Sequence, residues 1–219
     1  MYYALIGDMV GSKRLSPEKR REAQEKLRLA LENVNCKFAP DVAAKFIITL
    51  GDECQGLMRA NGDPVSAALA VMRGLKPFEI RFSIGFGEIV TPIDPTAAIG
   101  ADGPAFHLAR RRVEAMKTKH GARLRFALSD PDTEETLNTV AALCDKLALD
   151  MTEKQYELVY SLLSARISGA KLTQTELASV SGVGQSTVNA QLASAGFNEY
   201  CGGVMYIRKK LAEHSASNE

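Results

Sequence analysis

The stretch ITLGDECQGLM, residues 48–58, joins two runs of strand-forming residues through Gly51, Asp52 and Glu53. Glycine and aspartate are ordinary turn residues, so the stretch predicts a β-hairpin with its tip at Asp52. A tip that faces water tolerates two adjacent carboxylates but does not need them. A functional interpretation of Asp52 therefore requires a second carboxylate that reaches the same point from elsewhere in the chain.

The segments around this hairpin follow the order of a split βαβ sheet. The predicted elements are a strand at 2–7, a helix from Pro17 behind the cap Ser16, hairpin arms at 46–50 and 55–58, a helix from Asp63 and Pro64, a strand at 78–90, a helix at 105–119 and a strand at 124–128. The order strand, helix, strand, strand, helix, strand is typical of ferredoxin-like sheets. The fold class predicted from the sequence is therefore α+β, with a ferredoxin-like sheet domain.

This order supplies the second carboxylate. In a split βαβ sheet the first strand and the strand leaving the hairpin are neighbours, so Asp8 and Asp52 are expected to meet at one edge. Two carboxylates a few Å apart repel each other unless one is protonated or a cation lies between them. Mg²⁺ accepts one or two carboxylates and completes its shell with water and phosphates, and Mn²⁺ is an alternative. The backbone carbonyl of Met9 is a further candidate ligand.

An anion site is predicted beside this metal site. Gly11 and Ser12 can turn backbone N–H groups towards an anion at the start of the first helix, and Lys13 or, alternatively, Arg14 adds positive charge. Together the residues predict a divalent cation bound with the polyphosphate of a nucleotide. The plainer alternative is a strand end, a hairpin turn and a solvated stretch that leads into a helix.

Composition bounds the other possibilities. The chain has 219 residues, and 46% of them are hydrophobic. Its formal charge of +1 favours neither a nucleic acid nor a membrane as a partner. Four separated cysteines and three histidines form no zinc pattern and no disulfide framework. No segment has the features of a signal peptide or a membrane span, so we expect a soluble, cytoplasmic protein.

The carboxy-terminal part has the pattern of a winged helix-turn-helix. We expect a sheet domain at 1–130, a connecting helix at 131–150, a winged helix-turn-helix at 151–212 with a hairpin wing around Gly202 and Gly203, and a disordered tail at 213–219. The second helix of the motif offers polar side chains suited to reading bases: Gln185, Ser186, Thr187, Asn189 and Gln191. From residue 151 onward, however, basic and acidic residues balance, which is unusual for a DNA-binding domain. A winged helix that binds protein, including a second copy of this chain, remains the alternative.

The motifs resemble two known families. ALIGDMVGS (4–12), ITLGDECQGLM (48–58) and IRFSIGFGEIV (80–90) resemble strand motifs of class III nucleotidyl cyclases, and GADGPAFHLARRR (100–112) resembles their glycine turn and helix. More closely, nearly the whole chain resembles the SatD family, which shares these motifs in this order, often ahead of a helix-turn-helix. The cyclase resemblance implies metal-binding aspartates at Asp8 and Asp52, and a homodimer, because cyclase folds typically pair through this domain.

The cyclase resemblance also implies roles for residues 100–112, although the chain departs from the cyclase pattern at some positions. Arg111 matches the arginine that stabilises the moving phosphate, whereas His107 stands where cyclases have an asparagine that holds the ribose. The base-selecting positions fall near Ile48 and Gly100, which lack the required groups. Three hypotheses follow. The first is a regulator that binds a nucleotide with a metal and touches DNA, and the second is an enzyme that performs Mg²⁺-dependent phosphoryl chemistry, cyclisation or hydrolysis, on a nucleoside triphosphate. The third is a protein-interaction scaffold with a vestigial pocket.

Overall fold

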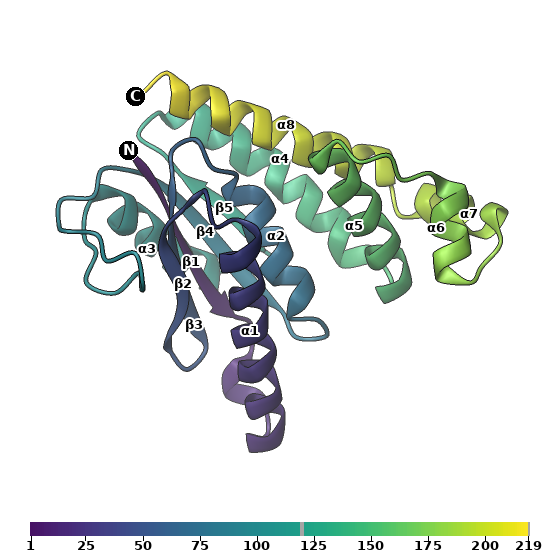
Figure 1. Ribbon diagram of the computed structural model, residues 1–219, viewed down its shortest axis with the longest axis horizontal. Coiled ribbons are helices and arrows are strands. Elements are labelled where there is room, and N and C mark those ends of the chain that lie inside the picture. Colours follow the sequence, from purple (N-terminus) through teal and green to yellow (C-terminus); the bar gives the residue numbers. More distant parts are fainter. Residues whose placement is uncertain (119–120, 219) are drawn as a thin grey trace. The chain divides into compact units, whose positions relative to one another are not determined.

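A computed structural model describes residues 1–118 and 121–218, and the chain divides into two compact units. The first unit comprises Met1–Thr139 together with Arg208–Glu219, and the second comprises Val140–Ile207. The first holds a five-stranded sheet with helices on it, and the second is helical (Figure 1). The predicted α+β class is confirmed. No helix in the described part of the chain is both long and apolar enough to cross a membrane.

The sheet has the strand neighbours that the split βαβ order predicts. Its strands are β1 (Tyr2–Met9), β2 (Val42–Leu50), β3 (Glu53–Arg59), β4 (Ile80–Gly87) and β5 (Leu124–Ala127), in the spatial order β2-β3-β1-β4-β5. The first four strands pair antiparallel, and β5 joins β4 in parallel. The central position of β1 is decisive, because it brings the end of β1 next to the beginning of β3.

Two helices cover one face of the sheet, α1 (Pro17–Lys37) and α2 (Pro64–Gly74) (Figure 1). Each begins with proline behind a capping side chain, as predicted: Ser16 accepts a hydrogen bond from the backbone N–H of Lys19, and Asp63 accepts one from that of Ser66. These caps satisfy N–H groups that the first turn of a helix leaves without partners. The same two helices enclose apolar side chains against the sheet.

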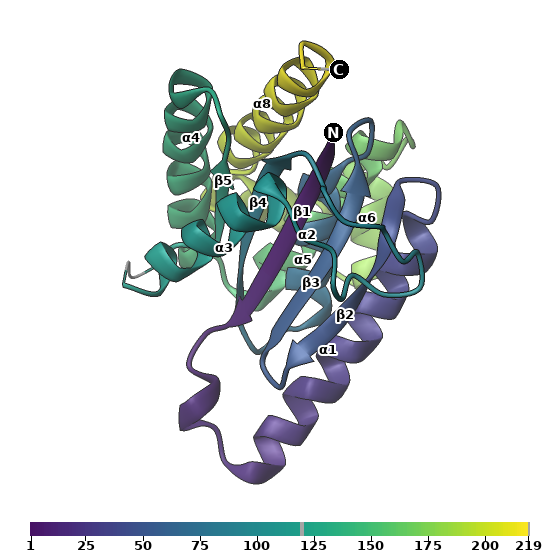
Figure 2. The same cartoon turned by 90° about the vertical axis from the view of Figure 1, so that its left-hand side faces the viewer.

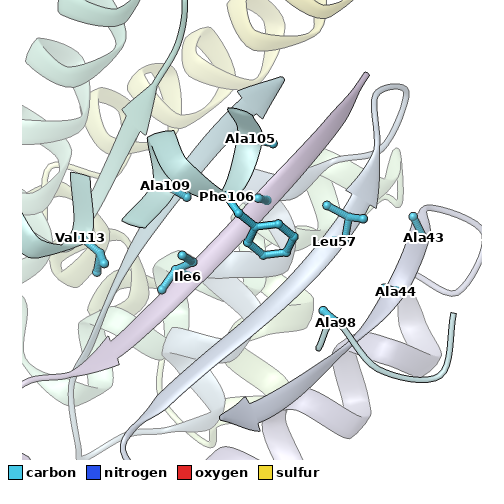
Figure 3. Close-up of a cluster of buried hydrophobic side chains, with 10 residues drawn as sticks. Ile6, Ala43, Ala44, Leu57, Ala98, Ala105, Phe106, Ala109 and Val113 are labelled. Atoms are coloured by element: carbon cyan, nitrogen blue, oxygen red, sulfur yellow. The ribbon is translucent and has the colours of Figure 1, made fainter. Parts of the chain in front are cut away.

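The other face of the sheet carries α3 (Pro104–Lys117), which crosses β4 and β1 (Figure 2). This approach is close because Gly85 in β4 has no side chain: a Cβ there would lie 2.7 Å from the backbone nitrogen of Ala109. Ile6, Leu57 and Phe106 belong to the buried cluster between this face and α3 (Figure 3). Residue 119, the last of the helix expected at 105–119, lies outside the described residues.

The remaining helices correct two predictions. They are the short η1 (Ser12–Arg14), α4 (Pro131–Asp150), α5 (Glu153–Ser168), α6 (Gln174–Ser181), α7 (Gln185–Ser194) and α8 (Phe197–Ala216). The hairpin wing expected around Gly202 and Gly203 is wrong, because both glycines lie inside α8. Residues 213–216, expected in a disordered tail, are also helical, and buried Ser215 donates a hydrogen bond to the carbonyl of Ala60 at 2.6 Å. Residue 219 lies outside the described residues.

Candidate functional site

The candidate site lies where β1 ends and the β2–β3 hairpin turns, at the edge of the sheet formed by the strand ends. Asp8 in β1 stands opposite Glu53 at the start of β3, and the N–H of Met9 donates to the carbonyl of Asp52 at 2.9 Å. The hairpin tip is therefore fixed to the end of β1. Asp8 and Asp52 lie at the same edge, as their order in the chain predicts.

Asp8 is a largely buried carboxylate that two cations of the protein already contact. Its side chain is 13% exposed; one oxygen lies 3.3 Å from Nε of Arg81 and the other 3.4 Å from Nζ of Lys117. Burial raises the pKa of Asp8 above its usual value, Lys117 and Arg81 act in the opposite direction, and repulsion from Asp52 adds to the increase.

Asp52 belongs to a hollow on the α1 side of the edge. The hydroxyl of Ser12 donates to a carboxylate oxygen of Asp52. The hollow has a volume of about 220 Å³ and is lined by Met9, Ser12, Lys13, Arg20, Gln24, Gly51 and Asp52. Arg20 donates a hydrogen bond to the carbonyl of Ser12, and Gln24 donates one to the carbonyl of Gly51 at 2.9 Å. Side chains of α1 therefore contact both the turn after β1 and the hairpin turn, which line this hollow.

The turn that follows β1 has the conformation expected of its glycine. Gly11 adopts a φ of 71°, a left-handed value that residues with side chains rarely take. The turn directs Ser12 to Asp52 and places Lys13 in the wall of the hollow. The structure thus brings together the metal and phosphate candidates Met9, Ser12, Lys13 and Asp52, with Gly11 shaping the turn.

Helix α3 places a different arginine at this edge than the family resemblance indicates. Arg110 forms an ion pair with Glu53, and the same guanidinium lies 3.4 Å from the side-chain oxygen of Gln55. Arg111 is exposed, and His107 pairs at 2.8 Å with Asp102 at the start of the helix. Within one chain, neither Arg111 nor His107 is brought to the Asp8 and Asp52 carboxylates.

The two cations beside Asp8, Arg81 and Lys117, were missed from the sequence, as were Arg20 and Gln24 in the hollow. Arg81 stands directly opposite Asp8 in the pairing of β1 with β4, and directly opposed residues of an antiparallel pair share one face. The register of the predicted sheet could therefore have identified Arg81. Lys117 lies seven residues after Arg110, two helical turns, so the two project from the same side of α3.

A family model described as the SatD family matches residues 2–212, nearly the whole chain. The chain belongs to the SatD family. This confirms the resemblance of the sequence motifs to the SatD family. A comparison with curated proteins found no match.

The donor atoms of this SatD-family chain fit one kind of metal site. Among the described residues, no cluster of three or more His, Cys, Asp and Glu side chains could hold a metal ion. Two carboxylates can hold a hard divalent ion whose remaining ligands are water and substrate phosphates, and Asp8 and Asp52 are the candidates here; Asp52 lines the hollow, whereas Asp8 contacts Arg81 and Lys117. The chemistry of these side chains, carboxylates near a hydroxyl and an ammonium group, is the chemistry that a cation bound with a phosphate-bearing ligand would require.

In the second unit of the SatD-family chain, the segment predicted as a helix-turn-helix contains two short helices, α6 and α7, joined by Gly182, Val183 and Gly184. Val188 and Leu192 of α7 are buried. The polar candidates Gln185, Ser186, Thr187 and Asn189 are exposed, whereas Gln191 is half-buried and its carbonyl accepts a hydrogen bond from Gln155. The exposed side of α7 is polar and carries no charged residue.

The charge of this unit is acidic. Residues 140–207 include six acidic side chains and four basic ones: Asp145, Asp150, Glu153, Glu157, Glu176 and Glu199 against Lys146, Lys154, Arg166 and Lys171. The basic residues expected on a wing lie in α8, where Arg208 pairs with Asp63, and Lys209 and Lys210 pair with Glu213. The α6–α7 pair therefore lies in a unit without the positive charge that usually accompanies DNA binding.

Proposed function

We propose that this SatD-family protein is a cytoplasmic regulator whose sheet unit binds a nucleoside triphosphate together with Mg²⁺ or Mn²⁺. The observation that carries the proposal is the placement of Asp8 and Asp52 at one edge beside a hollow lined by Ser12 and Lys13. Carboxylates attract the cation, and the hydroxyl and ammonium groups suit the phosphates.

Each residue has a defined role in this proposal. Asp8 and Asp52 hold the cation, and the carbonyl of Met9 is a further candidate ligand. Gly11 lets the chain turn, so that Ser12 and Lys13 face the phosphate groups. The cation neutralises the repulsion between the two carboxylates and the phosphates, which is why we expect cation and nucleotide to bind together.

Thermal unfolding tests this proposal. We expect the unfolding temperature to rise when a nucleoside triphosphate and Mg²⁺ are both present, to rise less with either alone, and to lose this increase in Asp52→Asn. Asp41→Asn is the matched control, because Asp41 precedes β2 and lies at the opposite end of that strand from the hairpin tip. If none of the four triphosphates shifts the wild-type protein with Mg²⁺ or Mn²⁺, the proposal is wrong.

The second candidate function is enzymatic: phosphoryl chemistry on the bound triphosphate, with Arg111 stabilising the developing charge and His107 beside it. These residues are exposed on α3 and turned away from the carboxylates of their own chain, so this function needs them to come from a second copy in a homodimer. A cyclic or hydrolysed product that disappears in both Asp52→Asn and Arg111→Ala would support it. Mixing the two variants should then restore activity, which would not happen if both residues acted within one chain.

DNA binding by α7 is the remaining part of the regulator proposal, and the helix-turn-helix geometry supports it. Because the unit is acidic, we expect binding to require low salt and two copies of the chain. Retention of genomic DNA fragments at about 50 mM salt, lost in a Gln185→Ala and Asn189→Ala double variant, would support it. Without any retention, a protein partner for α7 replaces DNA in the proposal.

A further inference from the structure

Lys117 has two acidic neighbours at the candidate site. Its ammonium group lies 2.7 Å from a carboxylate oxygen of Glu114, on the same helix, and 3.4 Å from Asp8. The Lys117 side chain is 37% exposed, whereas Arg81, the other cation beside Asp8, is 12% exposed. Lys117 is thus the more accessible of the two cations beside Asp8, and it makes its shorter contact elsewhere.

These contacts allow Lys117 to leave Asp8 at little cost. A buried carboxylate needs a compensating charge, so removing the ammonium group without replacement is unfavourable. A divalent cation supplies that replacement. Lys117 meanwhile keeps a carboxylate partner three residues earlier on α3, where neighbouring helical side chains meet. Arg81 remains beside Asp8 in both states.

We infer that Lys117 is an exchangeable occupant of the cation position beside Asp8, and that a divalent ion enters when Lys117 moves to Glu114 alone. The inference rests on the proposed cation site and adds a residue that sets its affinity. Lys117 keeps Asp8 compensated when the ion is absent and competes with the ion when it is present.

The test measures Mn²⁺ binding to the full-length protein by electron paramagnetic resonance of the free ion. We expect Lys117→Gln to bind Mn²⁺ roughly two- to fivefold more tightly than the wild type, the range of a partly exposed ion pair. Glu114→Gln should bind it more weakly, because Lys117 then has only Asp8 as its partner. Lys37→Gln is the charge-matched control: Lys37 ends α1, about 30 Å along the helix from the start near the site.

A double variant separates competition from a general effect of charge. If removing charges acted only through the electrostatic field, the Lys117→Gln and Glu114→Gln effects would add and cancel. If Lys117 competes for Asp8, the double variant binds as tightly as Lys117→Gln alone, because Glu114 acts only through the lysine. Additive effects, or a Lys117→Gln affinity equal to that of wild type, would overturn this inference while leaving the cation site in place. No Mn²⁺ binding by any variant would overturn the inference and the cation site together.

Discussion

Replacement of Gly85 by alanine tests how the sheet positions the α3 side of the site. An ideal Cβ at this position would lie 2.7 Å from the backbone nitrogen of Ala109 and would also overlap the carbonyl oxygen of Ala105. Ordinary contacts between such atoms are about 3.5 Å, and the overlap with the Ala105 oxygen is the larger of the two, so α3 must move away by roughly 1 Å. Backbone atoms of a helix cannot swing aside as a flexible side chain does, and the whole helix takes up the displacement.

The displacement has a cost and a consequence for the site. Overpacking of this kind typically costs about 1–3 kcal/mol. Arg110 and Lys117 belong to α3, so the contacts of Arg110 with Glu53 and of Lys117 with Asp8 lengthen when the helix moves. We expect Gly85→Ala to lower the free energy of unfolding by about 1–3 kcal/mol. Urea unfolding followed by far-UV circular dichroism measures this, since the chain has no tryptophan to report by fluorescence.

Gly202 provides the matched control, because a Cβ there meets no atom within 4 Å. Gly202 lies inside α8, so Gly202→Ala should stabilise the protein by about 0.4–1 kcal/mol through the lower entropy of the unfolded chain. The two glycine substitutions are thus expected to act in opposite directions. A Gly85→Ala protein as stable as the wild type would refute the close packing of α3 on β4.

Three further predictions concern single side chains. Burial raises the pKa of the Asp8 carboxyl above its usual value of 3.8, so the folded chain binds a proton at Asp8 more tightly than the unfolded chain does. The stability that comes from this protonation is complete below about pH 3.8 and is lost as the pH rises through the raised pKa. Urea unfolding between pH 4 and 7 without divalent ions should therefore show the wild type losing stability relative to Asp8→Asn, and parallel curves would contradict this. Thr173→Ala removes the capping box with Glu176 and should therefore speed hydrogen exchange in α6. The free energy of opening of α6, measured from the exchange rates, should fall by about 1 kcal/mol in Thr173→Ala and stay unchanged in Thr173→Ser. Arg208→Gln breaks contacts of 2.6 and 2.8 Å with Asp63 and should cost about 1.5 kcal/mol in urea unfolding, and an unchanged midpoint would show that this pair adds nothing.

The sheet unit was predictable because its signals are local. Proline behind a capping residue marks the first turns of α1 and α2, and strand-forming runs around Gly51 and Asp52 mark the hairpin. These signals depend on residues a few positions apart. Once they fix the element order, the split βαβ arrangement makes β1 and β3 neighbours, and the placement of Asp8 near Asp52 follows without further information.

The side-chain partners of α3 depend instead on how the helix is rotated about its axis. Its buried positions include Ala109, Val113 and Met116, which face the sheet. With about 100° per residue, Arg110 and Lys117 flank this buried stripe, whereas Arg111 falls almost opposite it. Motif similarity assigned a role to Arg111 without this geometry. The apolar spacing of the helix was visible in the sequence and would have favoured Arg110 over Arg111 as a neighbour of the sheet.

The missing wing shows why a glycine pair is ambiguous. Two adjacent glycines between strand-like runs predict a hairpin, but a glycine in a helix also permits close packing. A Cβ at Gly203 would lie 2.5 Å from Sγ of Cys144 and 3.5 Å from Cγ1 of Val140, so this glycine lets α8 approach α4 within the second unit. Sequence alone does not distinguish the two uses, since the neighbour that makes the glycine necessary lies some 60 positions earlier in the chain.

The helical conformation of the segment predicted as a wing also bears on DNA binding. A wing would have carried Arg208, Lys209 and Lys210 to the phosphates, whereas in α8 all three have carboxylate partners. Hydrogen bonds from glutamine or asparagine to base edges select a sequence, but phosphate contacts supply most of the affinity and its dependence on salt. A recognition helix without charged residues, in an acidic unit, lacks that contribution. The shape of the helix-turn-helix is therefore weaker support for DNA binding than retention at low salt would be.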